Sequence, residues 1–197
     1  DNMKLDYVEE EDEAAFYGPK LDVQMRNVYG KEDTLFTVQI DFALPERFDM
    51  TYEGKDGKKH RPMVIHRSSI GCIERTMALL IELYAGKFPL WLSPLQVKLL
   101  TVTDRANKFA EHVLQELRKA GIRAELDNRS ESINKKVREA TLEKVPLIVV
   151  LGDKEIEGKI LSVRTLNGEV HNRIGIKKFI KLVQENINDK LLIFEFK

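Results

Sequence analysis

A charged pair, Glu74 and Arg75, stands in a stretch that is otherwise apolar. Residues 70–84 read IGCIERTMALLIELY, and the hydrophobic residues fall on every face of the helix that they predict. We therefore expect protein to cover both sides of this helix. An arginine in such surroundings needs a counter-charge. Either a ligand or another segment supplies it, and a structural pair with Glu74 is the simplest alternative.

The residues just before this helix predict a strand with a polar end. Met63 to Ile65 indicate a short buried strand that ends in His66 and Arg67, and Gly71 permits close approach between helix and strand. A zinc site needs about three or four ligands. No zinc-like spacing surrounds His66, because Cys72 is predicted to face away from it. A lone histidine at a strand end is most often structural.

Two earlier strands are predicted upstream of His66. Residues 21–25 alternate apolar and polar after a Gly-Pro turn, and residues 35–44 read LFTVQIDFAL. The second strand has Thr37, Gln39 and Asp41 on one face and hydrophobic residues on the other. Such a polar face is either solvated or displayed to a ligand.

Length and composition fit a globular protein of one large or two small domains. The chain has 197 residues, 43% of them hydrophobic, and its single cysteine excludes an internal disulfide. No stretch reaches 18 uncharged apolar residues, so we expect no membrane helix. Residues 1–60 carry 15 acids and 8 bases (−7), and residues 61–197 carry 17 acids and 24 bases (+7). A polyanion should prefer the second part.

The second half of the chain alternates strands and helices, which predicts an α/β layer with parallel pairing. A connector at 89–94 with two prolines marks the domain boundary. We expect Asp104 to cap the first helix of this half. Strands are predicted at 97–102, 122–126 and 147–151, helices at 104–120, 130–142 and 177–186, a hairpin at 159–171, and a short strand or ordered tail at 191–196.

The sequence Gly71-Cys72-Ile73-Glu74-Arg75, after a strand ending in His-Arg, resembles motif 3 of class II aminoacyl-tRNA synthetases. With Phe16-Tyr17-Gly18-Pro19-Lys20 it is similar to the threonyl-tRNA synthetase family. The resemblance implies an α/β chain: the C-terminal half of a class II antiparallel-sheet catalytic domain at 1–88, a linker at 89–94, and an α/β anticodon-binding domain at 95–197. The second domain would hold a mixed five-stranded sheet with flanking helices.

The resemblance implies roles for five residues of the first domain. Arg75 would bind the γ-phosphate of ATP, and Gln39 would contact the adenylate and the substrate. Tyr17 and Lys20 would line the amino-acid pocket. His66 would be one ligand of a Zn²⁺ ion that binds the amino and hydroxyl groups of threonine. The other zinc ligands, and motifs 1 and 2, are expected outside this stretch.

In the second domain the resemblance assigns Glu155 and Arg164 to reading anticodon bases. Unpaired RNA bases are read through hydrogen bonds to their Watson-Crick edges. Ser130 stands where the family often has asparagine. Arg129 and Arg138 are available for the phosphate backbone. Taken alone, Gly152-Asp153-Lys154-Glu155 is a turn after a strand.

The implied parent is a threonine-tRNA ligase that uses ATP with Mg²⁺ to activate threonine and transfer it to tRNA(Thr). The resemblance further implies a cytoplasmic homodimer, of which this chain would be the C-terminal part and inactive alone. Two alternatives stay open: a catalytically inactive synthetase-like protein that binds tRNA or regulates, and a prolyl- or histidyl-type synthetase. His66 discriminates against the second, because the threonine enzyme requires a zinc ligand there.

Overall fold

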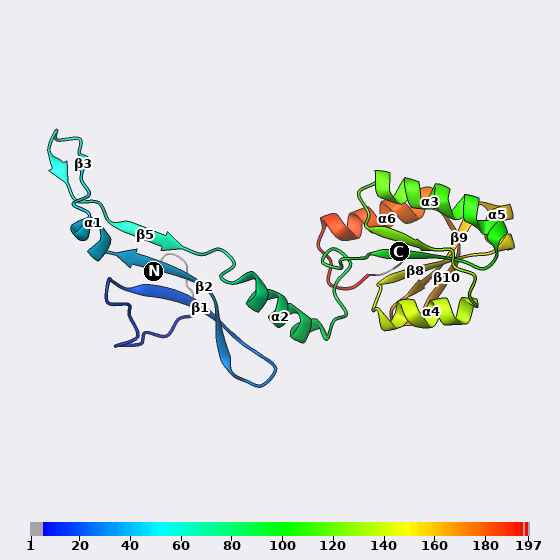
Figure 1. Cartoon of the computed structure of the whole chain (residues 1–197), viewed down its shortest axis with the longest axis horizontal. Helices are drawn as coiled ribbons and strands as arrows, with labels where there is room; N and C mark the ends of the chain where they lie inside the picture. Colours follow the sequence, from blue (N-terminus) through cyan, green and yellow to red (C-terminus); the bar gives the residue numbers. More distant parts are fainter. Residues whose placement is uncertain (1–5, 195, 197) are drawn as a thin grey trace. The chain divides into compact units, whose positions relative to one another are not determined.

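The computed structural model describes residues 6–194 and 196 of the chain. It divides into two compact units, Asp1–Leu83 and Tyr84–Lys197, each with its own sheet (Figure 1). The division falls a few residues before the connector at 89–94 where the sequence predicts the domain boundary. No helix in the described part of the chain is long and apolar enough to cross a membrane.

The first unit is built on a three-stranded antiparallel sheet with the order β1-β2-β5. Its strands are β1 (Lys20–Arg26), β2 (Glu32–Asp41) and β5 (Val64–Arg67). A short helix, α1 (Ala43–Arg47), follows β2 and takes up the last residues of the predicted strand. The turn signal Asp56-Gly57 predicts a hairpin at residues 53–60, and the structure confirms it as β3 (Tyr52–Glu53) and β4 (Lys59–His60). Gly57 has the left-handed conformation that this turn requires.

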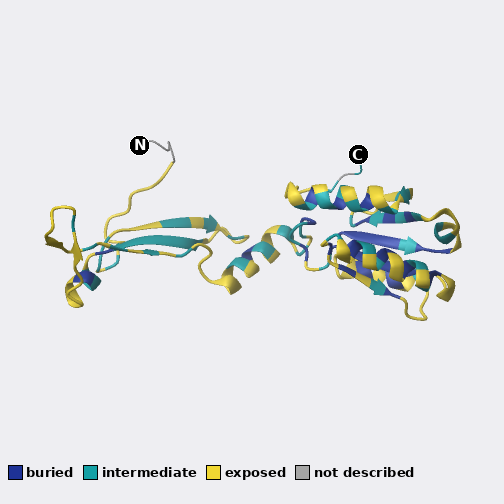
Figure 2. Ribbon diagram, turned by 90° about the horizontal axis from the view of Figure 1, so that it is seen from above, coloured by how far each residue is buried: buried dark blue, intermediate teal, exposed yellow. Residues whose placement is uncertain are grey.

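The expectation that protein covers the apolar helix on both sides is wrong for the described residues. The helix, α2 (Ile73–Tyr84), buries only Leu79, whereas Ile73 and Met77 are more than half exposed (Figure 2). The preceding strand β5 is not buried either, since Ile65 is 65% exposed. An apolar pattern predicts that a helix face will be buried, but it does not identify the segment that buries it. In the described part of the first unit, the three-stranded sheet and the β3–β4 hairpin leave these apolar residues exposed.

The second unit contains the mixed five-stranded sheet that the family resemblance implies. Its strand order is β10-β9-β8-β6-β7. Strand β6 pairs in parallel with β7 and with β8, while β8–β9 and β9–β10 are antiparallel. The bounds are β6 (Val97–Thr101), β7 (Ala124–Asp127), β8 (Leu147–Leu151), β9 (Ile160–Thr165) and β10 (Val170–Gly175).

Helices cover both faces of this sheet, which explains why β8 reads as a continuous hydrophobic run, LIVVL. One face packs against α3 (Asn107–Lys119) and α6 (Ile176–Asn188), and the other against α4 (Ile133–Leu142) (Figure 1). A single-turn helix, η1 (Asp104–Ala106), leads into α3. The larger core lies on the α3 and α6 side and includes the fully buried Leu99 and Phe179.

Two local predictions in the second unit are wrong. Asp104 does not cap the first helix: Thr103 is the N-cap residue, and no side chain caps it. Residues 152–155 are not a simple turn but begin a helix, α5 (Asp153–Gly158). The backbone N–H of Gly152 donates to Glu155 Oε2 at 2.9 Å. This side-chain contact satisfies a donor at the helix start, which is the effect of a glutamate at this position in a capping box.

Candidate functional site

Three of the sequence-predicted residues lie in one row across the first sheet. Lys20 in β1 pairs with Gln39 in β2, and Gln39 pairs with His66 in β5. Side chains of directly opposed residues stand on the same face of a sheet. The fold therefore brings Lys20, Gln39 and His66 together, although 46 positions separate the first from the last.

Tyr17 joins this row from the loop before β1. Its hydroxyl donates to Gln39 Oε1 at 2.7 Å, which leaves the Gln39 amide N–H groups available as donors. The Tyr17 ring also meets the His66 imidazole edge-on, with centroids 6.2 Å apart. Together these groups open into a hollow of about 540 Å³, whose lining residues are Phe16, Tyr17, Gln39, Asp41, Ala43, Leu44, Arg47, Phe48 and His66.

Asp41 holds His66 in a defined orientation. Its Oδ2 lies 2.9 Å from His66 Nε2, and its Oδ1 accepts the backbone N–H groups of Ala43 and Leu44. These hydrogen bonds, that of Leu44 first, lower the pKa of the nearly buried Asp41 carboxyl. A carboxylate at Nε2 favours the tautomer with its proton there, so Nδ1 is the nitrogen left to bind a ligand.

Lys20 is a fixed cation at one end of the row. Its ammonium group lies 2.9 Å from Asp22 Oδ2, and this hydrogen bond raises the pKa of Lys20. Burial raises the pKa of Asp22, but the hydrogen bonds from Lys20 and Thr37 outweigh it and lower the pKa overall. Both groups are therefore charged at neutral pH, and Lys20 can attract an anionic group of a substrate.

The structure places Arg75 away from this row. Arg75 Nη1 donates to the carbonyl of Thr34 at 3.2 Å. Thr34 precedes Gln39 by five positions, or about 17 Å along an extended strand. The alternative of a structural pair with Glu74 is not seen among the described residues, since Glu74 accepts from Cys72 Sγ and carries no ion pair to Arg75.

Gly71 permits a close approach at the entry of α2, as the sequence predicts, but the strand approached is β2 and not the preceding strand β5. Its φ is +70°, and a Cβ added there would lie 2.1 Å from the carbonyl oxygen of Leu35. Only glycine accommodates both conditions without a backbone shift. The close approach lets Arg75, one turn into the helix, reach the backbone of β2.

In the second unit, Glu155 and Ser130 lie at the same edge of the sheet. Glu155 follows β8 and Ser130 follows β7, so both stand beyond the carboxyl ends of parallel strands. This edge is where open α/β sheets generally bind ligands. One carboxylate oxygen of Glu155 is engaged by Gly152, and the hydroxyl of Ser130 has no hydrogen-bond partner in the described residues.

Arg164 lies further along the sheet, opposite Ile148 in β8. Its neighbours Val163 and Thr165 are buried on the α3 and α6 side, and Arg164 therefore faces the side that α4 partly covers. The same face carries the hydrogen bond from Ser162 to Asn172, 2.7 Å long. Arg164 therefore lies on a sheet face near the amino end of β8, whereas Glu155 lies beyond the carboxyl end of that strand.

The two arginines predicted for phosphate contacts differ in their surroundings. Arg129 binds both oxygens of Asp127, at 2.9 and 2.6 Å, and also Glu139 Oε2 at 2.6 Å. These hydrogen bonds, that of Asp127 first, raise the pKa of Arg129. Arg138 is exposed and forms no ion pair with any described residue. The phosphate role stays a prediction for both.

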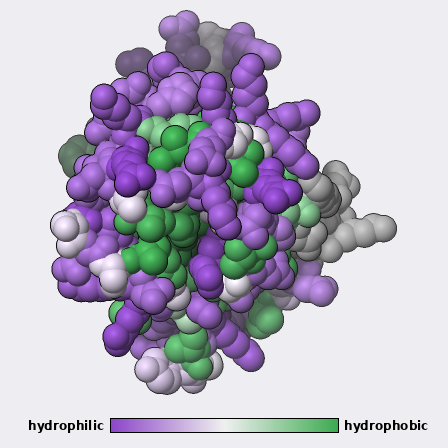
Figure 3. Space-filling model, turned by 90° about the vertical axis from the view of Figure 1, so that its right-hand side faces the viewer, coloured by the Kyte–Doolittle hydropathy of each residue, from purple (hydrophilic) through white to green (hydrophobic). Residues whose placement is uncertain are grey.

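The face of the second unit that carries α5 combines apolar and charged groups. Figure 3 shows hydrophobic side chains at the centre of this face and hydrophilic ones around them. Val102, which follows β6 and contacts the Gly152 position of α5, is 44% exposed. An apolar floor with a polar rim suits a flat, partly apolar ligand such as an unstacked base.

Sequence reasoning missed Asp41 as the partner of His66. The signal was present, because Thr37, Gln39 and Asp41 were recognised as one polar face, but nothing in the spacing links Asp41 to His66 25 residues later. Arg47 and Phe48 also line the hollow, but they follow the end of the predicted strand at 35–44, and no sequence pattern there indicates the short helix α1.

Comparison with known proteins assigns both units. Residues 3–84 match the model of the tRNA synthetase class II core domain (G, H, P, S and T), and residues 96–186 match the anticodon binding domain. The chain belongs to the class II aminoacyl-tRNA synthetases. Among curated synthetases, it is 56% identical over 190 residues to the threonine--tRNA ligase of Clostridium botulinum (strain Eklund 17B / Type B).

A second similar synthetase is the threonine--tRNA ligase of Clostridium perfringens (strain SM101 / Type A), 57% identical over 169 residues. These alignments cover 96% and 85% of this chain, but only 30% and 26% of the relatives. Among solved structures, the RNA binding domain of threonyl-tRNA synthetase from Cryptosporidium parvum Iowa II superposes with a TM-score of 0.77 at 30% identity. That match covers 93% of this chain and 45% of the other.

Proposed function

We propose that this chain supplies part of the substrate site and the anticodon-reading domain of a threonine-tRNA ligase. Identity of 56% to a threonine--tRNA ligase supports the proposal. The observation that carries it in the site is the row of Lys20, Gln39 and His66, completed by Tyr17 and Asp41. A substrate there meets an ammonium group, an amide donor, a phenol and an imidazole.

In the proposed reaction, the carboxylate of threonine attacks the α-phosphate of ATP, and pyrophosphate leaves. A terminal ribose hydroxyl of the tRNA then attacks the acyl carbon, and AMP leaves. No covalent enzyme nucleophile is needed, so the protein acts by positioning and by charge neutralisation. Gln39, oriented by Tyr17, donates its amide to the adenylate, and Lys20 offers positive charge beside it.

Arg75 would bind the γ-phosphate at the far end of β2 from Gln39. Its planar guanidinium suits the bidentate recognition of phosphate. ATP with Mg²⁺, threonine and tRNA(Thr) are the partners of the proposed enzyme, and we expect it to be a cytoplasmic homodimer.

His66 fits the part of a single zinc ligand. Asp41 occupies Nε2 and leaves Nδ1 free, which is the usual arrangement of a histidine that binds a metal. The described residues contain no group of three potential ligands, so the remaining ligands would come from elsewhere in the enzyme. When bound, Zn²⁺ would ligate the hydroxyl of threonine and thereby disfavour valine.

The second unit would read the anticodon at the edge formed by Glu155 and Ser130, with Arg164 on the adjoining face. The Glu155 oxygen that does not hold Gly152 can accept from the edge of a guanine. Val102 provides an apolar surface between the strand ends. Arg138 is an exposed cation in α4, the helix that begins just after Ser130, and it has no carboxylate partner in the described part of the unit.

The test is binding of the purified chain to short RNA stem-loops that carry the anticodon of threonine, proline or histidine. Fluorescence anisotropy should show tightest binding to the threonine stem-loop. Glu155→Gln should reduce this preference, while Glu157→Gln, an exposed change in the same helix, should not. Equal affinity for all three stem-loops would contradict the proposal, and preference for the proline or histidine anticodon would favour the corresponding synthetase.

A further inference from the structure

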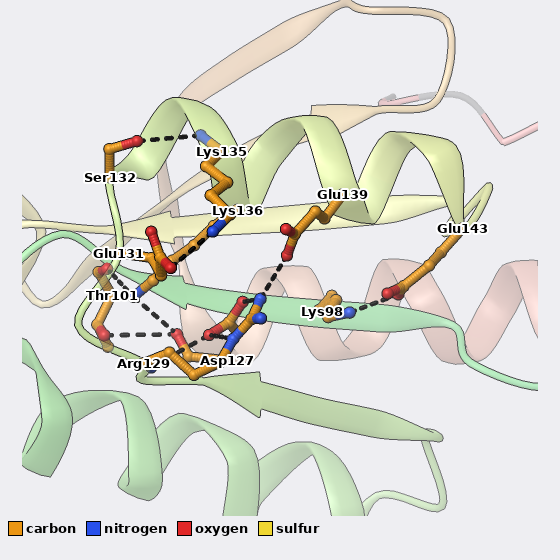
Figure 4. A network of polar contacts seen from close by, with 10 residues as sticks. All are labelled: Lys98, Thr101, Asp127, Arg129, Glu131, Ser132, Lys135, Lys136, Glu139 and Glu143. Carbon is orange, nitrogen blue, oxygen red and sulfur yellow. Dashed lines mark hydrogen bonds and ion pairs between the residues drawn. The ribbon is translucent and has the colours of Figure 1, made fainter.

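Lys136 is the largest fully buried side chain of the described residues, although it is charged. It lies in α4 with 2% of its surface exposed. Its ammonium group donates to the carbonyl of Thr101 at 2.9 Å and to the carbonyl of Asp127 at 3.3 Å. A buried ammonium group is costly unless it is hydrogen-bonded. Here the acceptors are the last carbonyls of β6 and β7, so Lys136 joins two strand ends to α4 (Figure 4).

Arg129 makes a second link between the same elements. Its Nε and Nη2 bind the two carboxylate oxygens of Asp127 at the end of β7, and Nη2 also binds Glu139 in α4. The backbone N–H of Arg129 donates to Asp127 Oδ1 as well, at 3.1 Å. Glu139 follows Lys136 by three positions and so lies on the same side of the helix. Figure 4 shows both links around Asp127.

These two links enclose the loop at residues 128–132, which carries Ser130. Within the loop, the N–H of Glu131 donates to the carbonyl of Arg129 at 2.9 Å. At its end, Ser132 caps α4 by accepting from the N–H of Lys135, and Lys135 forms an ion pair with Glu131. Ser130 is thus held at an edge whose backbone is fixed from both sides, while its own side chain faces no partner in the described residues.

We propose that Lys136 and Arg129 are positioning residues for RNA recognition, and that neither contacts phosphate. Lys136 from within the core and Arg129 at the surface bind other groups of the protein and so fix the loop at 128–132 at the carboxyl ends of β6 and β7. The proposal rests on the proposed function, in which this edge reads RNA. It assigns a role to Lys136, and it gives Arg129 a different role from the phosphate contact that the sequence suggests.

The charges of the surrounding groups separate this proposal from direct phosphate binding. Lys136 cannot reach a phosphate, because it is buried. Nε and Nη2 of Arg129 are taken by two carboxylates, whose negative charges would also repel an approaching phosphate. Arg138, two positions after Lys136, is exposed without such a partner among the described residues. It is the matched control for a cation that acts on phosphate directly.

The salt dependence of RNA binding distinguishes the two roles. A cation that neutralises a phosphate contributes about one unit to the slope of log affinity against log salt, and its removal lowers that slope. We would measure binding of the full chain to the threonine stem-loop, and to one with a changed middle anticodon base, over a range of salt concentrations. The variants are Lys136→Met, Arg129→Gln, Glu139→Gln and Arg138→Gln.

Arg138→Gln should lower the salt slope and weaken both stem-loops equally. Lys136→Met and Arg129→Gln should leave the slope unchanged and reduce the preference for the unaltered anticodon severalfold. Glu139→Gln should reduce the preference too, although removal of a negative charge alone would strengthen RNA binding. A lower slope in Lys136→Met or Arg129→Gln, or an intact preference in all three, would overturn the proposal. If Lys136→Met does not fold, Arg129→Gln and Glu139→Gln, at more exposed positions, still test the proposal.

A second measurement tests the loop without RNA. Amide ¹⁵N relaxation and hydrogen exchange should show greater mobility at Arg129, Glu131 and Lys135 in Lys136→Met and Arg129→Gln than in the unaltered chain or in Arg138→Gln. Unchanged amides would overturn the proposal. If the unaltered chain binds no stem-loop, the proposed function fails. If it binds, but Lys136→Met or Arg129→Gln lowers the salt slope, only the positioning role fails.

Discussion

Asp41 Oδ2 and His66 Nε2 lie 2.9 Å apart and join the end of β2 to β5. Asp41 is anchored by two backbone N–H groups at the start of α1, so it orients the imidazole and not the reverse. The pair defines which nitrogen of His66 faces the hollow beside Tyr17 and Gln39.

Asp41→Asn should change the tautomer of His66. In the unaltered chain at a pH where the imidazole is neutral, we expect the proton on Nε2, because a carboxylate accepts it there. In the variant, an amide can present either a donor or an acceptor, and the population with the proton on Nδ1 should rise. Imidazole ¹⁵N chemical shifts measure this ratio. Asp49→Asn, at an exposed carboxylate that pairs with Arg61, is the control, and identical His66 shifts in both variants would contradict the account.

The stability of the second unit should depend on pH through Asp127. The hydrogen bond from Arg129 lowers the pKa of Asp127 below its ordinary value, and Arg129 likewise lowers that of Glu139. A carboxyl with a lowered pKa in the folded state stabilises the fold above the pKa of the unfolded chain, about 3.9 for Asp. This contribution is lost as pH falls through the lower, folded value.

Urea unfolding of the chain and of Asp127→Asn at several pH values measures this contribution. The difference in the free energy of unfolding should be constant above about pH 5 and should shrink as the pH falls below about 4. A difference that does not change with pH would mean that Asp127 stabilises the unit by something other than its charge.

Phe179→Ala should destabilise the second unit strongly. The ring is fully buried in the core between the sheet and α6. Removal of a buried phenylalanine side chain typically costs about 3–5 kcal/mol, from lost burial and from the cavity left behind. Leu142→Ala, at a residue that is 69% exposed, should change stability by less than about 0.5 kcal/mol. Chemical denaturation followed by circular dichroism compares them, and similar losses in both variants would refute this description of the core.

The fold of the second unit could be predicted almost entirely from the sequence. Alternating apolar runs and amphipathic segments predict β6, α3, β7, α4 and β8 in order, and Gly121, just after α3, has the positive φ typical of a glycine that ends a helix. Helix α5 was missed because six residues carry too little periodicity to be told from a turn. The feature that indicates this helix is the glutamate three positions after Gly152, which accepts the Gly152 N–H at the helix start.

The first unit shows the limit of such reasoning. Periodicity found β1, β2 and β5 but could not say what covers their apolar residues or those of α2. The site depended on register: Lys20, Gln39 and His66 meet only because of the strand pairing, which no local pattern specifies. The family resemblance identifies Lys20, Gln39 and His66 as site residues, whereas the roles of Asp41 and Lys136 follow from their hydrogen bonds in the structure.

Arg75→Lys should reduce the use of ATP by the enzyme to which this chain contributes. A suitable enzyme is a hybrid in which this chain replaces the matching 190 residues of the Clostridium botulinum ligase. Lysine keeps the charge but loses the planar fork, and a hydrogen bond to a charged group contributes about 1.5–3 kcal/mol. We expect kcat/KM for ATP in pyrophosphate exchange to fall on the order of tenfold or more. Cys72→Ser, an exposed change in the same turn, should have little effect.

The amino acid that this hybrid attaches to tRNA shows directly whether the chain is part of a threonine-tRNA ligase. We expect the hybrid to charge tRNA(Thr) with threonine and to reject valine, and we expect His66→Ala to abolish charging while the protein stays folded. A folded hybrid that charges proline or histidine, or that keeps full threonine charging after His66→Ala, would contradict the assignment of this chain to a threonine-tRNA ligase.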